Sequence, residues 1–250
     1  MSSSPLGGRT ALVTGGASGI GRACVAALSD AGATVHLADA DHAASGEVAD
    51  AHGAIAHVTD LTDPGSVESL PADVDILVNN AGVQHIAPLT EFPVEEFTRI
   101  QRLMVTTPFL LMRRCLPAMY GRGWGRVVNI SSVHGVRASP YKSAYVSAKH
   151  GLEGLNKVAA LEAAPHGVTS NCVAPGYVRT PLVSAQIADQ AASRGISTDA
   201  VVDEVFLGRT AVKRLIEPEE VAAVVLWLCG SEAAHLTGAS IPLDGAWTAS

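Results

Sequence analysis

The stretch TALVTGGASGIGRACVAALSDAGATVHLAD, residues 10–39, contains two strand patterns separated by a helix pattern. Residues 10–16 form an apolar run that ends in glycines, and residues 19–32 carry apolar side chains at helical spacing. Residues 34–40 are extended and apolar again. A strand, a helix and a second strand in this order predict a βαβ unit, in which the two strands are parallel.

The same alternation continues to the end of the chain, with helical stretches between most of the strand-like runs. Near-continuous apolar strands separated by helices are typical of a parallel sheet that is covered on both faces. Because no repeat or linker interrupts the pattern, we expect one doubly wound α/β domain of the Rossmann type over residues 1–250, with about seven strands. The five further runs are residues 54–60, 74–82, 125–132, 167–176 and 238–245.

Composition excludes several classes of protein. The 250 residues are 48% hydrophobic, which is enough to bury a sizeable core, and the formal net charge is -7. This charge repels phosphate backbones, and no Lys/Arg-rich run or zinc-like Cys/His spacing offsets it, so we expect neither a nucleic-acid partner nor a metal site. The N-terminus is short and polar, and the longest apolar run, residues 221–229, is too short to cross a bilayer.

We therefore expect a soluble cytoplasmic protein without a membrane partner. Its cysteines are widely separated and include no CxxC pair, which predicts small buried thiols in a reducing compartment. They are Cys24, Cys115, Cys172 and Cys229.

The glycines between the first strand and the first helix indicate a phosphate-binding turn. At Gly15, Gly19 and Gly21 the missing side chains would let a pyrophosphate approach backbone N–H groups and the helix N-terminus. The alternative is a glycine turn with a purely structural purpose. Asp39 ends the second strand, where a carboxylate can accept both adenosine ribose hydroxyls and repel a 2′-phosphate, so it favours NAD over NADP unless it is a solvated turn residue.

Tyr145 and Lys149 lie one helical turn apart if the stretch around them is helical, with Ser139 as a candidate N-cap and Pro140 in the first turn. An ammonium beside a phenol favours the phenolate, which brings the tyrosine pKa toward the range where it exchanges protons with an alcohol. Taken alone, the pair would also fit an ordinary surface. We expect the neighbouring Tyr141 to have a packing role.

Five motifs occur in the order in which one enzyme family has them. Together they resemble the short-chain dehydrogenase/reductase family, and the resemblance covers nearly the whole chain. The motifs are TGGASGIG (14–21), NNAG (79–82), NISS (129–132), YVSAK (145–149) and APGYVRTP (174–181).

The resemblance implies a role for each matched residue. Tyr145 would be the general acid/base, Lys149 would lower its pKa and bind the nicotinamide ribose, and Ser132, rather than Ser131, would hydrogen-bond the substrate oxygen. The implied NAD contacts are Gly15, Ser18, Gly19, Ile20, Gly21, Asp39, Asp60, Leu61, Asn80, Gly82, Tyr145, Lys149, Pro175, Gly176, Val178 and Thr180.

One position departs from the family pattern. Where the family usually has an asparagine whose backbone carbonyl holds a relay water near the active-site lysine, this chain has Met104. Pro108 follows four residues on and has no N–H, so it would free the carbonyl of Met104 from its helical partner and preserve the relay. The alternative is a proline that kinks the helix for packing.

A closer resemblance is to the D-3-hydroxybutyrate dehydrogenases within that family, through NNAGVQHIAP, SSVHG, SPYKSAY, VRTPLVSAQI and DGAWTAS. It implies that Gln84, His134, Lys142 and Gln186 bind a small carboxylate substrate, 3-hydroxybutyrate or acetoacetate, beside Ser132 and Tyr145. One cation and several donors suit a carboxylate buried in an acidic protein. Each residue also has a simpler explanation: a polar packing histidine, a solvated helix lysine, or surface amides.

The segment 183–215 interrupts the strand rhythm with two helical pieces, and we interpret it as a small helical lid over the substrate. Trp247 resembles an aromatic residue near a neighbouring subunit's site, although core packing is an equal alternative, and the family implies a homotetramer. Three other functions stay open. They are a 3-oxoacyl-thioester reductase using NADPH, another small 3-hydroxy acid or alcohol dehydrogenase, and a catalytically weak NAD-binding regulator.

Overall fold

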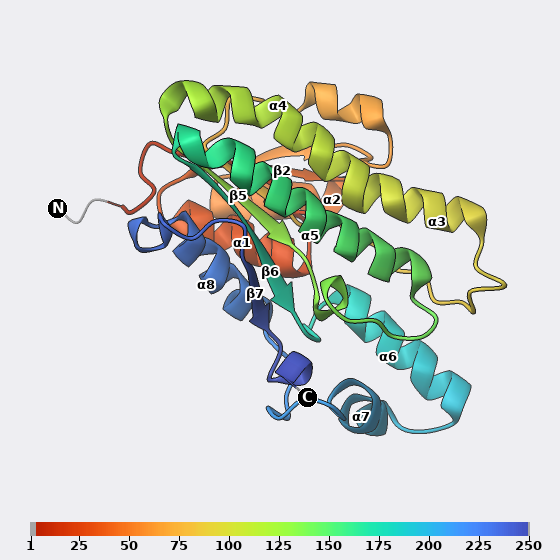
Figure 1. The fold of residues 1–250 in the computed structure, drawn as a ribbon. Coiled ribbons are helices and arrows are strands. Elements are labelled where there is room, and N and C mark those ends of the chain that lie inside the picture. The colour runs from red at the N-terminus through yellow and green to blue at the C-terminus, as the bar shows by residue number, and fades with distance from the viewer. Residues whose placement is uncertain (1–3, 250) are drawn as a thin grey trace.

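The computed structural model describes residues 4–249, which form a seven-stranded sheet with helices on both faces (Figure 1). The strand order is β3-β2-β1-β4-β5-β6-β7, and each neighbouring pair is parallel. This confirms the predicted doubly wound fold. The strands are β1 (Thr10–Thr14), β2 (Thr34–Asp39), β3 (Ile55–Val58), β4 (Ile76–Asn79), β5 (Gly125–Ile130), β6 (Val168–Pro175) and β7 (Ser240–Leu243).

Two helical layers enclose the sheet. Buried side chains of α1, α2 and α8 form one hydrophobic cluster with the strands, and those of α3, α4 and α5 form a second cluster on the opposite face. Figure 1 shows α6 and α7 beyond the ends of the last strands. The helices are α1 (Gly19–Asp30), α2 (His42–His52), α3 (Val94–Gln101), α4 (Thr107–Arg122), α5 (Ser143–Ala163), α6 (Pro181–Arg194), α7 (Thr198–Ala200) and α8 (Pro218–Cys229).

The centre of the sheet is covered on both faces, which explains why its strands read as unbroken apolar runs. All residues of β4, β5 and β6 are buried, whereas β3 at the edge is largely exposed. The chain winds outward in both directions from β1 and β4, so their carboxyl ends border the crevice that such sheets use for ligands.

Helix α5 begins later than the sequence predicts. Ser139 and Pro140 precede it in a turn, and Lys142 is the residue at its N-cap. The reason is Tyr141, whose positive φ of 69° cannot continue a right-handed helix and whose carbonyl accepts a hydrogen bond of 3.1 Å from the Ala87 N–H. Tyr141 is 60% exposed, so the prediction that it packs was also wrong.

The prediction of buried thiols is confirmed, because all four cysteines are buried and free. Across residues 4–249, no helix combines the length and the apolar character that spanning a bilayer would require.

Candidate active site

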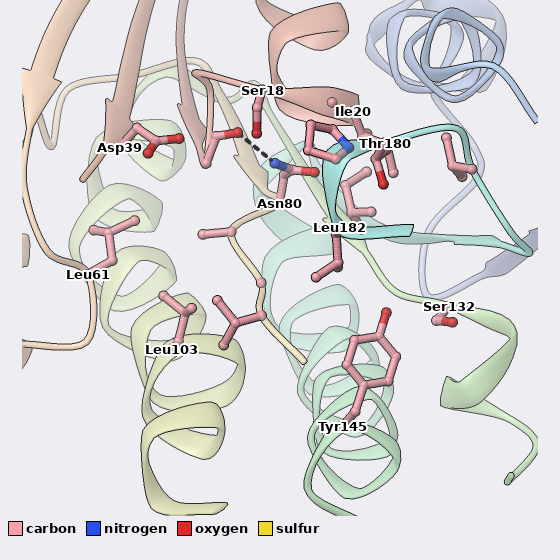
Figure 2. Close-up of a pocket in the computed structure, with 18 of the residues that line it drawn as sticks. Ser18, Ile20, Asp39, Leu61, Asn80, Leu103, Ser132, Tyr145, Thr180 and Leu182 are labelled. Atoms are coloured by element: carbon pink, nitrogen blue, oxygen red, sulfur yellow. Dashed lines mark hydrogen bonds between the residues drawn. The ribbon is translucent and has the colours of Figure 1, made fainter. Parts of the chain in front are cut away.

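A cavity of about 400 Å³ opens at the carboxyl ends of β1, β4, β5 and β6. Figure 2 shows its side chains, with Asp39 and Tyr145 at opposite ends and the phenol of Tyr145 pointing into the cavity. The structure therefore brings together residues from motifs that are far apart in the sequence. The predicted cofactor and catalytic residues on its wall are Gly15, Ser18, Gly19, Ile20, Asp39, Asp60, Leu61, Asn80, Gly82, Ser132, Tyr145, Lys149, Pro175, Gly176, Val178 and Thr180.

The glycine turn is held tightly against the start of α1. A Cβ atom at Gly21 would lie 1.9 Å from the Gly15 carbonyl oxygen, so this position has no room for a side chain. Gly21 is thus a packing residue beneath the turn and is not on the cavity wall. Asn80 fixes the turn from the other side, because its Nδ2 donates to the carbonyls of Thr14, at 2.9 Å, and Gly15, at 3.0 Å.

The N-terminus of α1 faces this cavity. Ser18 is the N-cap of α1, but its hydroxyl makes no capping hydrogen bond and lies on the cavity wall. A free hydroxyl beside unpaired helical N–H groups is a suitable site for a phosphate. The turn therefore fits the pyrophosphate of a dinucleotide.

Two aspartates border the far end of the cavity. Asp39 Oδ2 accepts a hydrogen bond of 3.0 Å from the Ala17 N–H, and its Oδ1 accepts one of 3.1 Å from the Asp41 N–H. These bonds hold the carboxylate in place beside the glycine turn. Hydrogen bonds from the backbone and the hydroxyl of Thr62 lower the pKa of Asp60, which keeps it charged at neutral pH.

The catalytic candidates meet at the opposite end. Lys149 is 4% exposed, and its Nζ donates a hydrogen bond of 2.6 Å to the Ile130 carbonyl. Burial lowers the pKa of Lys149 to about 8. Burial raises the pKa of Tyr145 to about 12, although a hydrogen bond with Ser132 opposes this increase.

This arrangement differs from the expectation that Lys149 brings the Tyr145 pKa toward neutrality. Lys149 Nζ lies 5.5 Å from the centre of the Tyr145 ring, and its hydrogen bond goes to a backbone carbonyl. Desolvation of the phenol therefore outweighs the ammonium charge here. The spacing along the helix could predict that the two residues are neighbours but not which of these two effects is larger.

The helix near Met104 is locally widened. A π-helical segment, η2 (Arg102–Thr106), joins α3 to α4, and the Thr107 N–H donates to the Arg102 carbonyl five residues back. Pro108 follows in the first turn of α4 and has no N–H to offer the Met104 carbonyl. The side chain of Met104 is buried, with its Cε 3.5 Å from where a Cβ at Gly82 would lie.

The four predicted carboxylate ligands lie in two groups, and neither group is on the wall of the main cavity. Gln84, after β4, and Gln186, on α6, form the first group, in which Gln186 Nε2 donates to Gln84 Oε1 at 3.1 Å. Gln84 Nε2 is buried and has no hydrogen-bond partner, so one donor of this pair remains available.

His134 and Lys142 form the second group. The His134 ring centre lies 6.0 Å from that of Tyr145, and its Nε2 is 2.9 Å from Ser139 Oγ. Burial lowers the pKa of His134 to about 4, so the ring is neutral. Lys142 is 9% exposed, burial lowers its pKa to about 8, and its Nζ lies 5.5 Å from the ring centre of Tyr177.

Comparison with known proteins agrees with this geometry. A family model described as enoyl-(acyl carrier protein) reductase matches residues 15–248. A solved structure described as a short chain dehydrogenase/reductase family protein superposes with a TM-score of 0.86 and 34% identity, covering 96% of this chain and 97% of that one. This chain belongs to the short-chain dehydrogenase/reductase family.

Two curated relatives within the short-chain dehydrogenase/reductase family bear the name D-beta-hydroxybutyrate dehydrogenase. The protein from Rhizobium meliloti is 44% identical, over 96% of this chain and 99% of its own length. The protein from Cupriavidus necator is 40% identical, over 98% of this chain and 99% of its own length. The chain is thus an oxidoreductase of a family whose members use nicotinamide cofactors.

Several residues of this short-chain dehydrogenase/reductase site were not predicted. Tyr177 lies in the APGYVRTP motif, yet its contacts with Lys142 and with Phe206, at 4.3 Å between ring centres, depend on tertiary structure. Trp247, for which the sequence allowed a role near a neighbouring subunit's site or core packing, is 7% exposed, and its ring lies 5.8 Å from that of His134. Other residues without a predicted role also line the cavity, among them Thr59, Thr62, Arg99 and Leu103, which lie outside the motifs quoted from the sequence.

Proposed function

We propose that this protein is an NAD-dependent dehydrogenase that oxidises (R)-3-hydroxybutyrate to acetoacetate and catalyses the reverse reaction. The observation that carries the proposal is Lys142, a buried cation that forms no ion pair among the described residues. A buried ammonium is costly unless an anion accompanies it. Its position beside His134, next to Tyr145, suits the carboxylate of a small hydroxy acid.

Each residue then has a defined task in the reaction. When bound along the cavity, NAD would supply the acceptor for the hydride that leaves C3 of the substrate. Tyr145, as the phenolate, takes the proton of the C3 hydroxyl, and Ser132 donates a hydrogen bond to the same oxygen. Lys149 binds the nicotinamide ribose and stabilises the phenolate, so we expect its ammonium to approach Tyr145 more closely when the cofactor is bound.

The carboxylate lies at the other end of the substrate, away from C3, and four side chains bind it. Lys142 supplies the positive charge, and His134, Gln84 and Gln186 supply neutral donors. Neutral His134 can donate one N–H because its pKa, near 4, keeps it uncharged throughout the physiological range. Segment 183–215 acts as the lid, since it carries Gln186 on α6 and Phe206 against Tyr177.

An assay of the purified protein tests the proposal. Acetoacetate with NADH is compared with an acetoacetyl thioester and NADPH, and with longer or branched 3-oxo acids and NADH. We expect the highest kcat/KM for acetoacetate and NADH. A preference for the thioester would indicate an acyl-thioester reductase, a preference for another 3-oxo acid would indicate a different small hydroxy acid, and no turnover would indicate a regulatory NAD-binding protein.

Asp39 leads to a prediction on the choice of cofactor. Because its carboxylate is held beside the glycine turn by the N–H groups of Ala17 and Asp41, a 2′-phosphate would meet a fixed negative charge. We expect NAD to be used at least about tenfold better than NADP. Asp39→Ala should bring the ratio of kcat/KM with NAD to kcat/KM with NADP closer to one. Asp41→Asn, which retains a helix cap, should leave this ratio unchanged. Equal use of both cofactors by the wild type would contradict the prediction.

Pro108 leads to a prediction on proton transfer. We propose that the Met104 carbonyl, to which Pro108 offers no N–H for an ordinary i+4 helical hydrogen bond, holds a water that connects Lys149 with solvent. Pro108→Ala should lower kcat by about three- to tenfold and change the Kd for NADH less. Pro117→Ala, at the second proline inside α4, is the matched control and should keep the wild-type kcat. Equal kcat values for both variants would contradict the relay.

We also propose that the protein is a homotetramer. Three large apolar side chains on the outer faces of α4 and α5 are exposed, namely Phe109 at 45%, Val158 at 51% and Leu161 at 79%. Burial between copies of the chain would remove this apolar surface from water. Sedimentation velocity of the wild type measures the assembly directly, and a monomeric species would contradict it.

A further inference from the structure

Glu153 is a buried carboxylate that the proposed reaction does not use. Helix α5 places Tyr145, Lys149 and Glu153 on one face at successive turns, so Glu153 follows Lys149 on the side away from Tyr145. Glu153 is 5% exposed. A charged residue at such a position is costly to bury, and its surroundings should therefore compensate it.

The surroundings of Glu153 supply hydrogen bonds. Ser240 on β7 donates a hydrogen bond of 2.9 Å to Glu153 Oε1. Cys172 on β6 hydrogen-bonds to the same carboxylate, and a Cβ at Gly135 would lie 3.1 Å from Oε1. Neutral donors and a glycine without a side chain thus make room for the carboxylate and stabilise it, but they do not balance its charge.

Among the described residues, the acidic groups that act on Lys149 are Cys172 and Glu153. Burial and the Glu153 carboxylate raise the pKa of the Cys172 thiol well above its usual value, so that thiol is neutral. His134, from η3 (Val133–Gly135), is neutral as well. Helix α3 presents the uncharged Gln101 to α5, through a hydrogen bond of 2.9 Å to the Ala144 carbonyl.

Glu153 lies between two lysines of its own helix. Lys157 lies one turn further along α5 and is exposed, so water screens its charge. Lys149 is buried, and Glu153 acts on it across a region from which water is largely excluded. The electrostatic partner of Glu153 is therefore Lys149.

We propose that Glu153 is a positioning residue whose negative charge keeps the buried Lys149 protonated. The inference rests on the proposed function and deepens it, because Lys149 must carry its charge to stabilise the Tyr145 phenolate. In the proposed reaction Tyr145 and Lys149 titrate as a coupled pair, in which the active form is the phenolate beside the ammonium. Glu153 is nearer to Lys149 than to Tyr145 along the helix, so it favours this form over the neutral pair.

A titration of Lys149 tests the proposal without any substrate. The chain contains four lysines, Lys142, Lys149, Lys157 and Lys213, so ¹³C labelling at lysine Cε gives few NMR signals. Lys149→Arg assigns the signal. We expect the pKa of Lys149 to be lower by about one unit or more in Glu153→Gln than in the wild type, because a nearby opposite charge is lost. Glu153→Asp, which retains the charge, should titrate close to the wild type.

Kinetics give a second measurement. At a pH near the wild-type pKa of Lys149, about 8, kcat for 3-hydroxybutyrate oxidation should fall about fivefold or more in Glu153→Gln and recover in Glu153→Asp. Glu153→Met is a second uncharged variant if the glutamine variant does not fold. An unchanged Lys149 pKa in the uncharged variants would overturn the role of Glu153. Inactivity of the wild type toward 3-hydroxybutyrate would overturn the proposed function but would leave the titration decisive for Glu153.

Discussion

Tyr145→Phe should lower kcat for 3-hydroxybutyrate oxidation by about a thousandfold. The substitution removes one oxygen atom, and with it the group that takes the proton from the substrate hydroxyl, a contribution of about 10²- to 10⁴-fold in comparable cases. The ring remains in place, so the contact with His134 should persist. Steady-state kinetics at several pH values measure the effect, and NADH fluorescence measures cofactor binding separately.

The matched control is Tyr141→Phe. Tyr141 is four residues earlier, is 60% exposed and is not on the cavity wall, so its hydroxyl should not affect kcat. We expect Tyr145→Phe to bind NADH with nearly the wild-type Kd. A kcat within a factor of about ten of the wild type would mean that another group transfers the proton.

Lys142→Ala should lower kcat/KM for 3-hydroxybutyrate by about 30- to 100-fold. A hydrogen bond to a charged group contributes about 1.5–3 kcal/mol, and the variant loses the cation that we assign to the carboxylate. Lys142 is 9% exposed and lies outside the cavity that holds the cofactor residues, so the Kd for NADH should not change.

Two further measurements make this second prediction specific. Lys157→Ala, at an exposed lysine on α5, the helix that begins directly after Lys142, should leave kcat/KM at its wild-type value. The kcat/KM for a neutral substrate, such as a short secondary alcohol, should fall little in Lys142→Ala, because this substrate has no carboxylate for Lys142 to bind. An unaltered kcat/KM for 3-hydroxybutyrate would show that Lys142 does not contact the substrate.

Much of the fold could be predicted because its elements follow local rules. The apolar runs of β4, β5 and β6 are long and continuous because these strands are buried on both faces. The cavity could be predicted in the same way, because parallel strands bring the residues that follow them to one edge of the sheet. Gly15, Asp39 and Tyr145 come from distant segments, yet each follows or faces a strand end.

Other features depend on tertiary contacts. The start of α5 was misplaced because the left-handed backbone of Tyr141 leaves no mark in the local pattern. The contact of Tyr177 with Lys142 links two segments whose approach no spacing rule describes. The pKa of Tyr145 depends on a balance between burial and nearby charges, and this balance can be evaluated only when the neighbours are known.

The hydrogen bond between the Ala87 N–H and the Tyr141 carbonyl has a consequence for redesign of substrate range. This bond connects the loop that carries Gln84 with the turn that carries Lys142, so we expect the two segments to move together. An insertion or deletion in either loop would displace a substrate contact in the other. Engineering for larger acids should therefore alter side chains on α6, where Gln186 lies, and keep the lengths of these two tied loops.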